Sequence, residues 1–296
     1  MPTLLDGTAT AAAIRAELRT EVAAFRAAHD RAPALRVVLV GDHPASASYV
    51  RGKTRAAHEV GIDAETVLLP ADASDADVLA TVDRLNADDA VDGILVQLPL
   101  PNAALEHRVV EAIAPAKDVD GFHPLNAGHV VTSTAGMAPC TPAGVVELLR
   151  RYGIDTRGQH AVVVGRSNVV GRPMAWLLTR PPQNATVTVC HRYTRDLGAF
   201  TRMADVLVVA VGQPGMITAD MVKDGAVVVD VGINLVDDAA HPNGYRLVGD
   251  VDFEGVAPKA SFITPVPGGV GPMTIAMLLR NTLDAAAARE RARVAG

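Results

Sequence analysis

Short apolar segments alternate with helix-like segments along the whole chain, and this alternation limits the folds that the chain can adopt. Apolar runs lie at 35–41 (LRVVLVG), 65–70 (ETVLLP) and 92–101 (DGILVQLPLP), with helix-like sequence at 45–60 and 74–86 between them. Strands that are buried on both faces of a parallel sheet have continuous apolar sequences of this kind. The pattern therefore predicts a βαβαβ arrangement with right-handed crossovers.

Two local signals support the helices of this first half. Gly61 follows the first helix-like segment, and glycine is the usual residue in the left-handed conformation that ends a helix. Ser74 and Asp77, three residues apart, form a variant of the capping box at the start of the second helix.

The periodicity fades between 115 and 142, where loop-forming residues dominate, and then restarts. A loop of this length in a compact protein usually has a function, and here it also leads into a second domain. A helix predicted at 143–152 precedes four more strands, within HAVVVG, NATVTVC, ADVLVVAVG and GAVVVDVG, and a long helix predicted at 271–296 ends the chain. The sequence therefore predicts an α/β protein.

Composition narrows the possible partners and compartments. The chain has 296 residues, of which 49% are hydrophobic, so it can bury a sizeable core, and its net charge of −6 without any basic block argues against nucleic acid. Its two cysteines are far apart, which argues against a disulfide framework or a zinc site. The amphipathic N-terminus does not resemble a signal peptide, and no apolar run is long enough to span a membrane. We therefore expect a cytoplasmic protein without a metal or membrane partner.

GRSNVVG (165–171) follows an apolar strand and opens a helix, which is where a nucleotide-binding turn belongs. It departs from GxGxxG because serine replaces the second glycine and the spacing differs. The backbone N–H groups at such a helix start suit a pyrophosphate. A tight turn without a ligand is the alternative.

The next strand indicates which dinucleotide would bind. An NAD-binding fold usually has a carboxylate at this strand end to hold the ribose 2′-hydroxyl. Here the strand runs into His191 and Arg192, and Arg166 lies in the preceding turn. Two guanidinium groups near the adenine ribose favour a 2′-phosphate, so we predict NADP rather than NAD. The alternative is that Arg192 is a solvated loop residue.

Tyr49 and Lys53 are four residues apart in the first predicted helix, so their side chains share one face. The chain has only four lysines against 23 arginines, which slightly favours a chemical role for Lys53 over a solvated surface cation. Gly52 costs about 1 kcal/mol relative to alanine inside a helix, so we expect it to permit the close approach of a backbone or a planar ligand. A lysine with a lowered pKa can transfer protons.

Three further segments carry candidate site residues. Gln97 interrupts an apolar strand, and a buried amide there must bond to backbone or face a site. Asp118 and Asp120 lie in a loop, where a carboxylate either forms a local Asx-turn or binds a ligand. PVPGGVGPMT (265–274) is the densest glycine–proline run and precedes a long helix, so it either borders a ligand or acts as a structural hinge.

Together, YVRGK, DGILVQLPLP, KDVDGFHPLNAG, PCTP, GRSNVVGRP, VGIN and TPVPGGVGPMT, in this order, resemble the bifunctional methylenetetrahydrofolate dehydrogenase/methenyltetrahydrofolate cyclohydrolase family. The resemblance spans essentially the whole chain. It implies two α/β domains flanking a cleft: a catalytic folate-binding domain at 1–140, on which the C-terminal helix 271–296 packs back, and a Rossmann-like NADP-binding domain at 141–270. It also implies a homodimer.

The resemblance also implies a role for each candidate residue. Lys53 transfers protons, Tyr49 stacks near the pterin, Gln97 hydrogen-bonds and tunes Lys53, and Asp120 holds the amino-pyrimidinone edge of the folate. The remaining contacts implied are with folate for Pro267, Gly268 and Gly269, and with NADP for Gly165, Arg166, Ser167, Arg192 and Ile233.

The implied reactions are the oxidation of 5,10-methylenetetrahydrofolate with NADP⁺ and the hydrolysis of the product to 10-formyltetrahydrofolate, without a metal. Two positions depart from the pattern of many members, in which a serine takes the place of Arg192 and a second lysine that of Arg55. Two other interpretations stay open: another two-domain NADP dehydrogenase, similar to shikimate dehydrogenase, and a non-catalytic nucleotide-binding module that would leave Lys53 unexplained.

Overall fold

The computed structural model describes residues 1–238 and 244–295. The chain divides into two compact units, each made of two separate stretches of sequence. The three-stranded unit contains Ala13–Cys140 and the residues from Ile275 onward, and the six-stranded unit contains Met1–Ala12 and Thr141–Thr274. The described helices include none that is long and apolar enough to cross a membrane.

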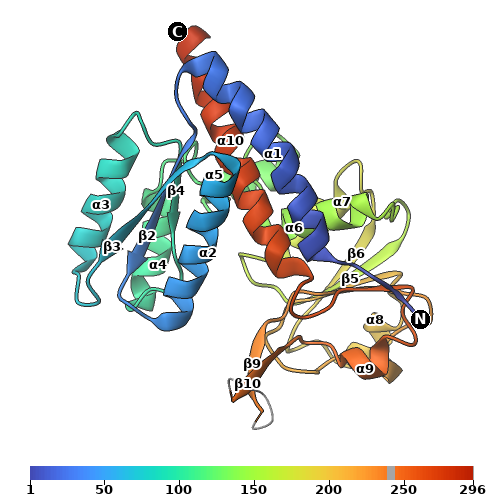
Figure 1. The fold of residues 1–296 in the computed structure, drawn as a ribbon. Coiled ribbons are helices and arrows are strands. Elements are labelled where there is room, and N and C mark those ends of the chain that lie inside the picture. Colours follow the sequence, from blue (N-terminus) through green and yellow to red (C-terminus); the bar gives the residue numbers. More distant parts are fainter. Residues whose placement is uncertain (239–243, 296) are drawn as a thin grey trace. The chain divides into compact units, whose positions relative to one another are not determined.

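The three-stranded unit has a wholly parallel sheet in the order β3-β2-β4, which confirms the predicted parallel arrangement (Figure 1). The strands are β2 (Ala34–Val40), β3 (Asp63–Leu69) and β4 (Gly93–Val96), and the connecting helices are α2 (Pro44–Val60) and α3 (Asp75–Ala87). Alternate residues of the strands point to one face of the sheet, where they join apolar residues of the helices in a buried core: Val38, Val40, Ile94 and Val96 with Val78, Val82 and Leu85.

Both predicted helix ends are confirmed. Gly61 ends α2 in the left-handed conformation, with φ of 89°. The Ser74 hydroxyl accepts a hydrogen bond from the Asp77 amide, and the Asp77 carboxylate accepts one from the Ser74 amide, so α3 begins with a complete capping box.

The segment 115–142, predicted as a loop, contains a helix. α5 (Pro124–Thr132) starts at a proline, and the His123 ring accepts a hydrogen bond from the Leu125 amide at its first turn. Only Asn126 and Val130 of this helix are buried, which is too few for a clear helical period in the sequence. Two further short helices, η1 (Ala103–Leu105) and α4 (Glu106–Ala112), precede this segment.

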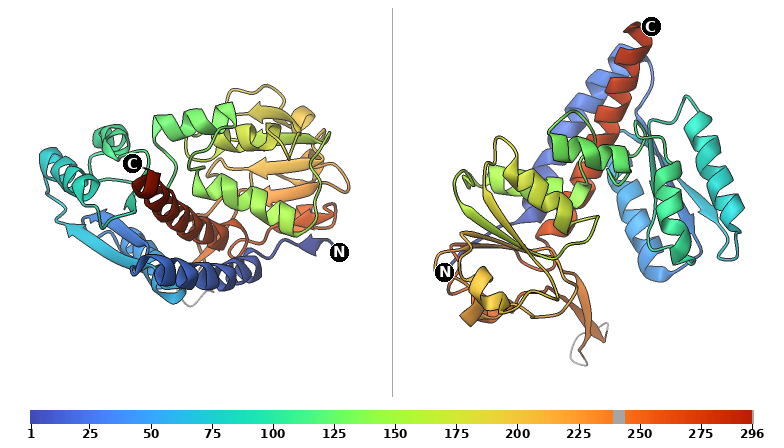
Figure 2. Two further views of the ribbon diagram at one scale, coloured as in Figure 1. Left: turned by 90° about the horizontal axis from the view of Figure 1, so that it is seen from above. Right: turned by 180° about the vertical axis from the view of Figure 1, so that it is seen from behind.

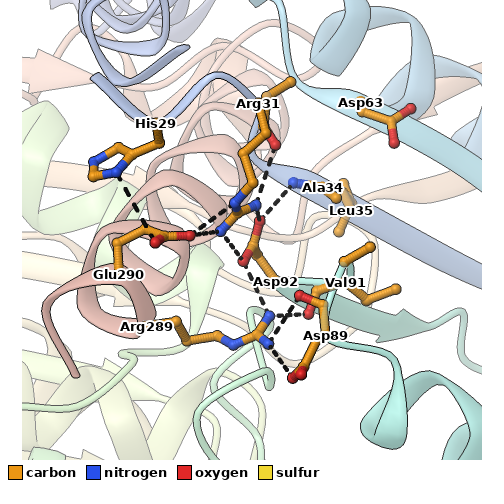
Figure 3. Close-up of polar contacts among 12 residues, drawn as sticks. His29, Arg31, Ala34, Leu35, Asp63, Asp89, Val91, Asp92, Arg289 and Glu290 are labelled. Carbon is orange, nitrogen blue, oxygen red and sulfur yellow. Dashed lines mark hydrogen bonds and ion pairs between the residues drawn. The ribbon is translucent and has the colours of Figure 1, made fainter. Parts of the chain in front are cut away.

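From Ile275 onward, the long C-terminal helix α10 (Val270–Ala295) belongs to the three-stranded unit, and Gly296 lies outside the described residues. Figure 3 shows the contact that fixes it, in which Asp92 lies between two guanidinium groups. The Asp92 carboxylate is fully buried and accepts two hydrogen bonds from Arg31, at 2.7 and 3.0 Å, and one from Arg289 of α10, at 3.0 Å. It also accepts one from the Ala34 amide, at 2.9 Å, at the start of β2.

The six-stranded unit has a parallel sheet in the order β1-β11-β8-β7-β5-β6, seen from two further directions in Figure 2. Its strands are β1 (Thr3–Leu4), β5 (His160–Val164), β6 (Thr186–Cys190), β7 (Val206–Val209), β8 (Val227–Asp230) and β11 (Phe262–Ile263). The helices of this unit are α6 (Cys140–Arg151), α7 (Gly171–Thr179), α8 (Leu197–Thr201), η2 (Ala219–Met221) and α9 (Phe253–Val256). One side of the sheet packs its alternate strand residues into a buried core: Val162, Val164, Leu207, Val209, Val228 and Ile263.

Two features of this unit differ from the sequence-based expectation. The first twelve residues were assigned to the first domain, but β1 pairs with β11, and α1 (Gly7–His29) begins beside Gly268, whose carbonyl accepts the Thr8 amide. A separate antiparallel hairpin, β9 (Asn234–Asp237) with β10 (Tyr245–Val248), also lies in this unit. β1 and β11 have only two residues each, and strands this short carry too little periodicity to be recognised from sequence.

Candidate functional site

Lys53, Tyr49 and Gln97 meet where β4 ends. Lys53 and Tyr49 lie on one face of α2, and the Lys53 Nζ is 4.6 Å from the centre of the Tyr49 ring. Gln97 directly follows β4, and its Oε1 accepts a hydrogen bond from Nζ at 3.1 Å. Lys53 is only 5% exposed. An ammonium group in this position is held by an amide oxygen and a ring face, so it is not the solvated surface cation of the alternative interpretation.

The Gln97 amide is fixed in one orientation. Its Nε2 donates to the Leu98 carbonyl, which leaves Oε1 turned toward Lys53. The Gln97 backbone amide donates to the Val38 carbonyl of the neighbouring strand. Gln97 thus bonds to backbone, as one interpretation holds, and also contacts Lys53, while its place in a binding site stays a prediction.

Gly52 borders open space. A methyl group placed on its Cα would meet no atom of the described residues within 4 Å, outside its own helix. No neighbouring backbone therefore requires a glycine here. Of the two expected causes, the close approach of a backbone is wrong, and room for a ligand stays a prediction.

The two loop carboxylates differ in what they bind. Asp118 is buried and accepts hydrogen bonds from the amides of Gly121 and His123, at 3.1 and 2.8 Å, and from the Asn126 side chain, at 2.9 Å. It is therefore the local turn-forming residue. Asp120 is partly buried and accepts no hydrogen bond from the described residues. Its carboxylate is left available to a ligand.

The charge of Asp120 is coupled to that of Lys53. Burial raises the pKa of Asp120 to about 6, while Lys53 opposes this rise and Asp118 adds to it. Burial and the nearby Asp120 also raise the pKa of Tyr49, so its phenol remains protonated at neutral pH. Near pH 7 the cluster holds a neutral phenol and a carboxylate that readily takes up a proton.

Two residues that the sequence analysis missed hold this loop in place. The Lys117 ammonium group donates to the carbonyls of Leu85, Asn86 and Asp88, where α3 ends, at 2.7 to 3.0 Å. The Asn281 side chain of α10 donates to the carbonyls of Val119 and Ala138, at 2.9 and 3.1 Å. No sequence signal identifies these partners, because each contact joins residues far apart in the chain. Together they fix the backbone on both sides of Asp120.

The turn after β5 presents unpaired backbone amides. Gly165 has φ of 129°, and a methyl group there would lie 2.2 Å from the Ala210 carbonyl oxygen, so only glycine fits. The Ser167 hydroxyl accepts from the amides of Val170 and Gly171 at the start of α7. The exposed amides of residues 166–169 donate to no acceptor in the described part of the chain. Such a set of free donors suits the oxygens of a pyrophosphate.

Arg166 and Arg192 follow neighbouring strands at the same edge of the sheet. Val164 of β5 is paired with Cys190 of β6, so the turns that carry the two arginines begin side by side. Both side chains are exposed, and within residues 1–238 and 244–295 neither forms an ion pair with a carboxylate. Their positive charge is available to an anionic ligand.

A hollow of about 490 Å³ in the six-stranded unit brings together Ile233 and the glycine–proline run. Ile233 is exposed and follows β8, and Pro267, Gly268 and Gly269 precede α10. Ile233, which is predicted to contact the cofactor, thus lines the same hollow as Pro267, Gly268 and Gly269, which are predicted to contact folate. Its size suits part of a small molecule.

Two buried carboxylates, which the sequence analysis also missed, shape the loops at this edge. Asp250 accepts hydrogen bonds from the amides of Val211, Gly212 and Gln213, at 2.7 to 2.9 Å, in the loop after β7. Asp230 accepts from the amides of Gly232, Asp250 and Val251, at 2.8 to 3.0 Å, and burial raises its pKa to about 6. The signal in the sequence was a carboxylate directly after an apolar strand, which also fits an exposed loop.

Two family models match the chain. The tetrahydrofolate dehydrogenase/cyclohydrolase catalytic domain matches residues 5–120, and the NAD(P)-binding domain of the same family matches residues 139–290. The bifunctional protein FolD 1 of Myxococcus xanthus is 58% identical over 97% of this chain and 98% of that protein.

Solved structures agree with these matches. The methylenetetrahydrofolate dehydrogenase-cyclohydrolase of Trypanosoma brucei, complexed with NADP and an inhibitor, is 40% identical, with a TM-score of 0.93 over 98% of this chain and 99% of that one. A shikimate dehydrogenase of Aquifex aeolicus is 12% identical, with a TM-score of 0.51 over 83% of this chain and 90% of that one. That second likeness concerns the fold alone.

Proposed function

Because the chain belongs to the tetrahydrofolate dehydrogenase/cyclohydrolase family, we propose that it oxidises 5,10-methylenetetrahydrofolate to the methenyl form with NADP⁺ and then hydrolyses this to 10-formyltetrahydrofolate. The observation that carries the proposal is the buried Lys53, held by Gln97 and the Tyr49 ring in a chain of this family. The shikimate dehydrogenase interpretation has only a likeness in fold to support it.

Lys53 is the proton-transfer group in this proposal. Hydrolysis adds water to the methenyl carbon and then breaks one C–N bond, so a proton must leave the water and another must reach the departing nitrogen. Gln97 fixes the direction of Nζ through a hydrogen bond of 3.1 Å. Tyr49 lies against the ammonium group and offers a ring on which the flat pterin stacks. A positioned acid–base group of this kind accounts for a large part of the rate.

Asp120 binds the amino-pyrimidinone edge of the folate in its ionised form. The pterin edge offers two N–H donors, and a carboxylate accepts both. No described residue occupies the carboxylate with a hydrogen bond, so its oxygens remain free for that pair. We place Pro267, Gly268 and Gly269 at the folate as well, because the family resemblance implies this contact and all three line a hollow.

We expect kcat/KM for methylenetetrahydrofolate to fall as the pH drops below about 6. Burial raises the pKa of Asp120 to about 6, so protonation below that pH removes the charged acceptor and weakens folate binding. The measurement is the pH profile of kcat/KM with folate as the varied substrate at saturating NADP⁺. The Asp120→Asn variant should lack this acidic limb. A variant profile with the same limb as the parent contradicts the assignment.

The residues around the β5 turn fit NADP. Free amides at residues 166–169 suit the pyrophosphate, and the uncompensated guanidinium groups of Arg166 and Arg192 suit the 2′-phosphate. Gly165 and Ser167 shape the turn, and Ile233, which follows β8 of the same sheet, offers an apolar surface to the cofactor. When bound, NADP⁺ supplies the hydride acceptor, and the protein supplies orientation.

Replacing Arg192 with alanine is expected to raise KM for NADP⁺ about ten-fold, since a hydrogen bond to a charged group contributes about 1.5 kcal/mol or more. KM for NAD⁺ should change little, because NAD⁺ lacks the 2′-phosphate. Arg195→Ala is the matched control, since Arg195 is also exposed and lies three residues away. Steady-state kinetics with both cofactors give the result. Equal effects of the two variants on NADP⁺ contradict the assignment.

A single assay tests the function as a whole. Purified protein is given methylenetetrahydrofolate with NADP⁺ or NAD⁺, and the methenyl intermediate is followed by its absorbance as it forms and disappears. Faster formation with NADP⁺, followed by hydrolysis, supports the proposal, whereas reduction that requires a hydroxy acid instead of folate contradicts it. We also propose that the enzyme is a homodimer and acts in the cytoplasm, as the family resemblance and the two buried, unpaired cysteines suggest.

A further inference from the structure

The Tyr193 ring lies against both cofactor-side arginines. The Cζ atom of Arg192 is 4.8 Å from the centre of the ring, and that of Arg166 is 5.7 Å away. Both distances are within the range of cation–π contacts, about 6 Å. The two arginines come from different turns, after β6 and after β5, so a single ring connects the two turns.

A local turn places this ring. The Tyr193 amide donates to Nδ1 of His191 at 3.2 Å, and the His191 amide donates to the Thr194 hydroxyl at 2.9 Å. The His191 ring also stands edge-on to the Tyr193 ring, with centroids 6.0 Å apart and an interplanar angle of 74°. Tyr193 is 65% exposed, so the ring is held by its neighbours in the turn and not by a hydrophobic core.

The Tyr193 ring lies against two positive charges at this edge of the sheet and can stabilise both. Two guanidinium groups repel each other, and in the part of the chain that the structure describes no carboxylate pairs with either of them. The face of an aromatic ring carries partial negative charge and attracts both cations without neutralising them. A carboxylate in its place would compete with the ligand's phosphate, whereas a ring leaves the N–H groups free for it.

We propose that Tyr193 is a positioning residue that holds Arg166 and Arg192 together for the 2′-phosphate of NADP⁺ and thereby helps to determine the choice of NADP⁺ over NAD⁺. The inference rests on the proposed function for its cofactor. It assigns to Tyr193 an indirect role in NADP⁺ binding: the residue makes no ion pair with the phosphate and acts through the two arginines. The phenol oxygen has no part in it.

The test compares a variant that removes the ring with one that keeps it. Tyr193→Leu should lower the ratio of kcat/KM for NADP⁺ to that for NAD⁺ about five-fold, the size expected for two exposed cation–π contacts. Tyr193→Phe retains the ring and should keep the parental ratio. Equal losses in the two variants would show that the hydroxyl, and not the ring, is responsible, and would overturn the proposal.

A double-mutant cycle shows whether the ring acts through the arginines. In an Arg192→Ala background, Tyr193→Leu should change the ratio by clearly less than five-fold, because one of its two partners is gone. In an Arg195→Ala background it should keep its full effect. A full effect in both backgrounds means that the ring does not act through Arg192, and an equal loss of kcat/KM for both cofactors means that it acts on a part that NADP⁺ and NAD⁺ share. Either result overturns the proposal.

Binding of two adenine nucleotides separates this proposal from the proposed function. Calorimetry with adenosine 2′,5′-bisphosphate and adenosine 5′-monophosphate requires no folate and no turnover. Tyr193→Leu should weaken binding of the bisphosphate several-fold more than that of the monophosphate, and equal weakening overturns the proposal. If this binding result holds while methylenetetrahydrofolate is not oxidised, the proposed function fails and the role of Tyr193 stands.

Discussion

Replacing Lys53 with glutamine is expected to lower the rate of methenyltetrahydrofolate hydrolysis by about 10²- to 10⁴-fold, the range for loss of a positioned acid–base group. Glutamine keeps a polar group near Gln97 but cannot exchange a proton with water or with the departing nitrogen. Lys53 is buried against Gln97 and Tyr49, so no other described ammonium group occupies this position. The measurement is the loss of methenyl absorbance at saturating substrate.

Arg55→Gln is the matched control for this variant. Arg55 lies on the same helix, its side chain is 80% exposed, and its nearest carboxylate, Glu59, is 4.0 Å away. Its loss should leave hydrolysis near the parental rate. Thermal unfolding of the Lys53 variant should match that of the parent, which separates catalysis from folding. Hydrolysis at the normal rate in a folded Lys53→Gln protein would refute the mechanism.

The largest expected effect on stability follows from Asp92→Asn, which should lower the free energy of unfolding of the three-stranded unit by about 3 kcal/mol or more. Asp92 is fully buried between Arg31 and Arg289, so the neutral amide leaves two guanidinium groups without their shared counter-charge. Because the chain has two compact units, a single melting temperature does not report on the three-stranded unit alone. Hydrogen exchange at the amides of β2 and β4 reports on this unit by itself.

Asp89→Asn makes the same chemical change at the edge of the same cluster. Its side chain is 92% exposed and lies 3.3 Å from Arg289. Exposed ion pairs contribute about 1 kcal/mol or less, so exchange at β2 and β4 should stay close to that of the parent. Similar losses in the two variants would show that burial does not set the strength of the Asp92 contact.

The sequence predicted best the features that depend on neighbouring residues. The alternation of apolar runs and helices predicted the parallel sheets, and the Ser74–Asp77 pair and Gly61 predicted helix ends that the structure confirms. The spacing of Tyr49 and Lys53 predicted that they share a face, because helical geometry is fixed by sequence separation.

Contacts between distant segments explain what could not be predicted. Asp118 and Asp120 have the same side chain two residues apart, and only the hydrogen bonds from the Asn126 side chain and from the amides of Gly121 and His123 show that Asp118 is the structural one. The partners of Asp250 lie 37 to 39 residues away. Pairing of β1 with β11 joins Thr3 and Leu4 to Phe262 and Ile263, which lie far away in the sequence. Nothing in the local composition marks such partners.

The three-stranded unit is built from two stretches of sequence that are far apart, and this affects when it can fold during synthesis. Its sheet is complete by Val96, but two of its stabilising residues come much later in the sequence, in α10: Arg289 neutralises Asp92, and Asn281 holds the backbone beside Asp120. Until they leave the ribosome, Asp92 has only Arg31 and the Ala34 amide as partners. We therefore expect nascent chains that stop before α10 to remain sensitive to protease in this unit, and the loop that carries Asp120 to become ordered only after α10 has been synthesised.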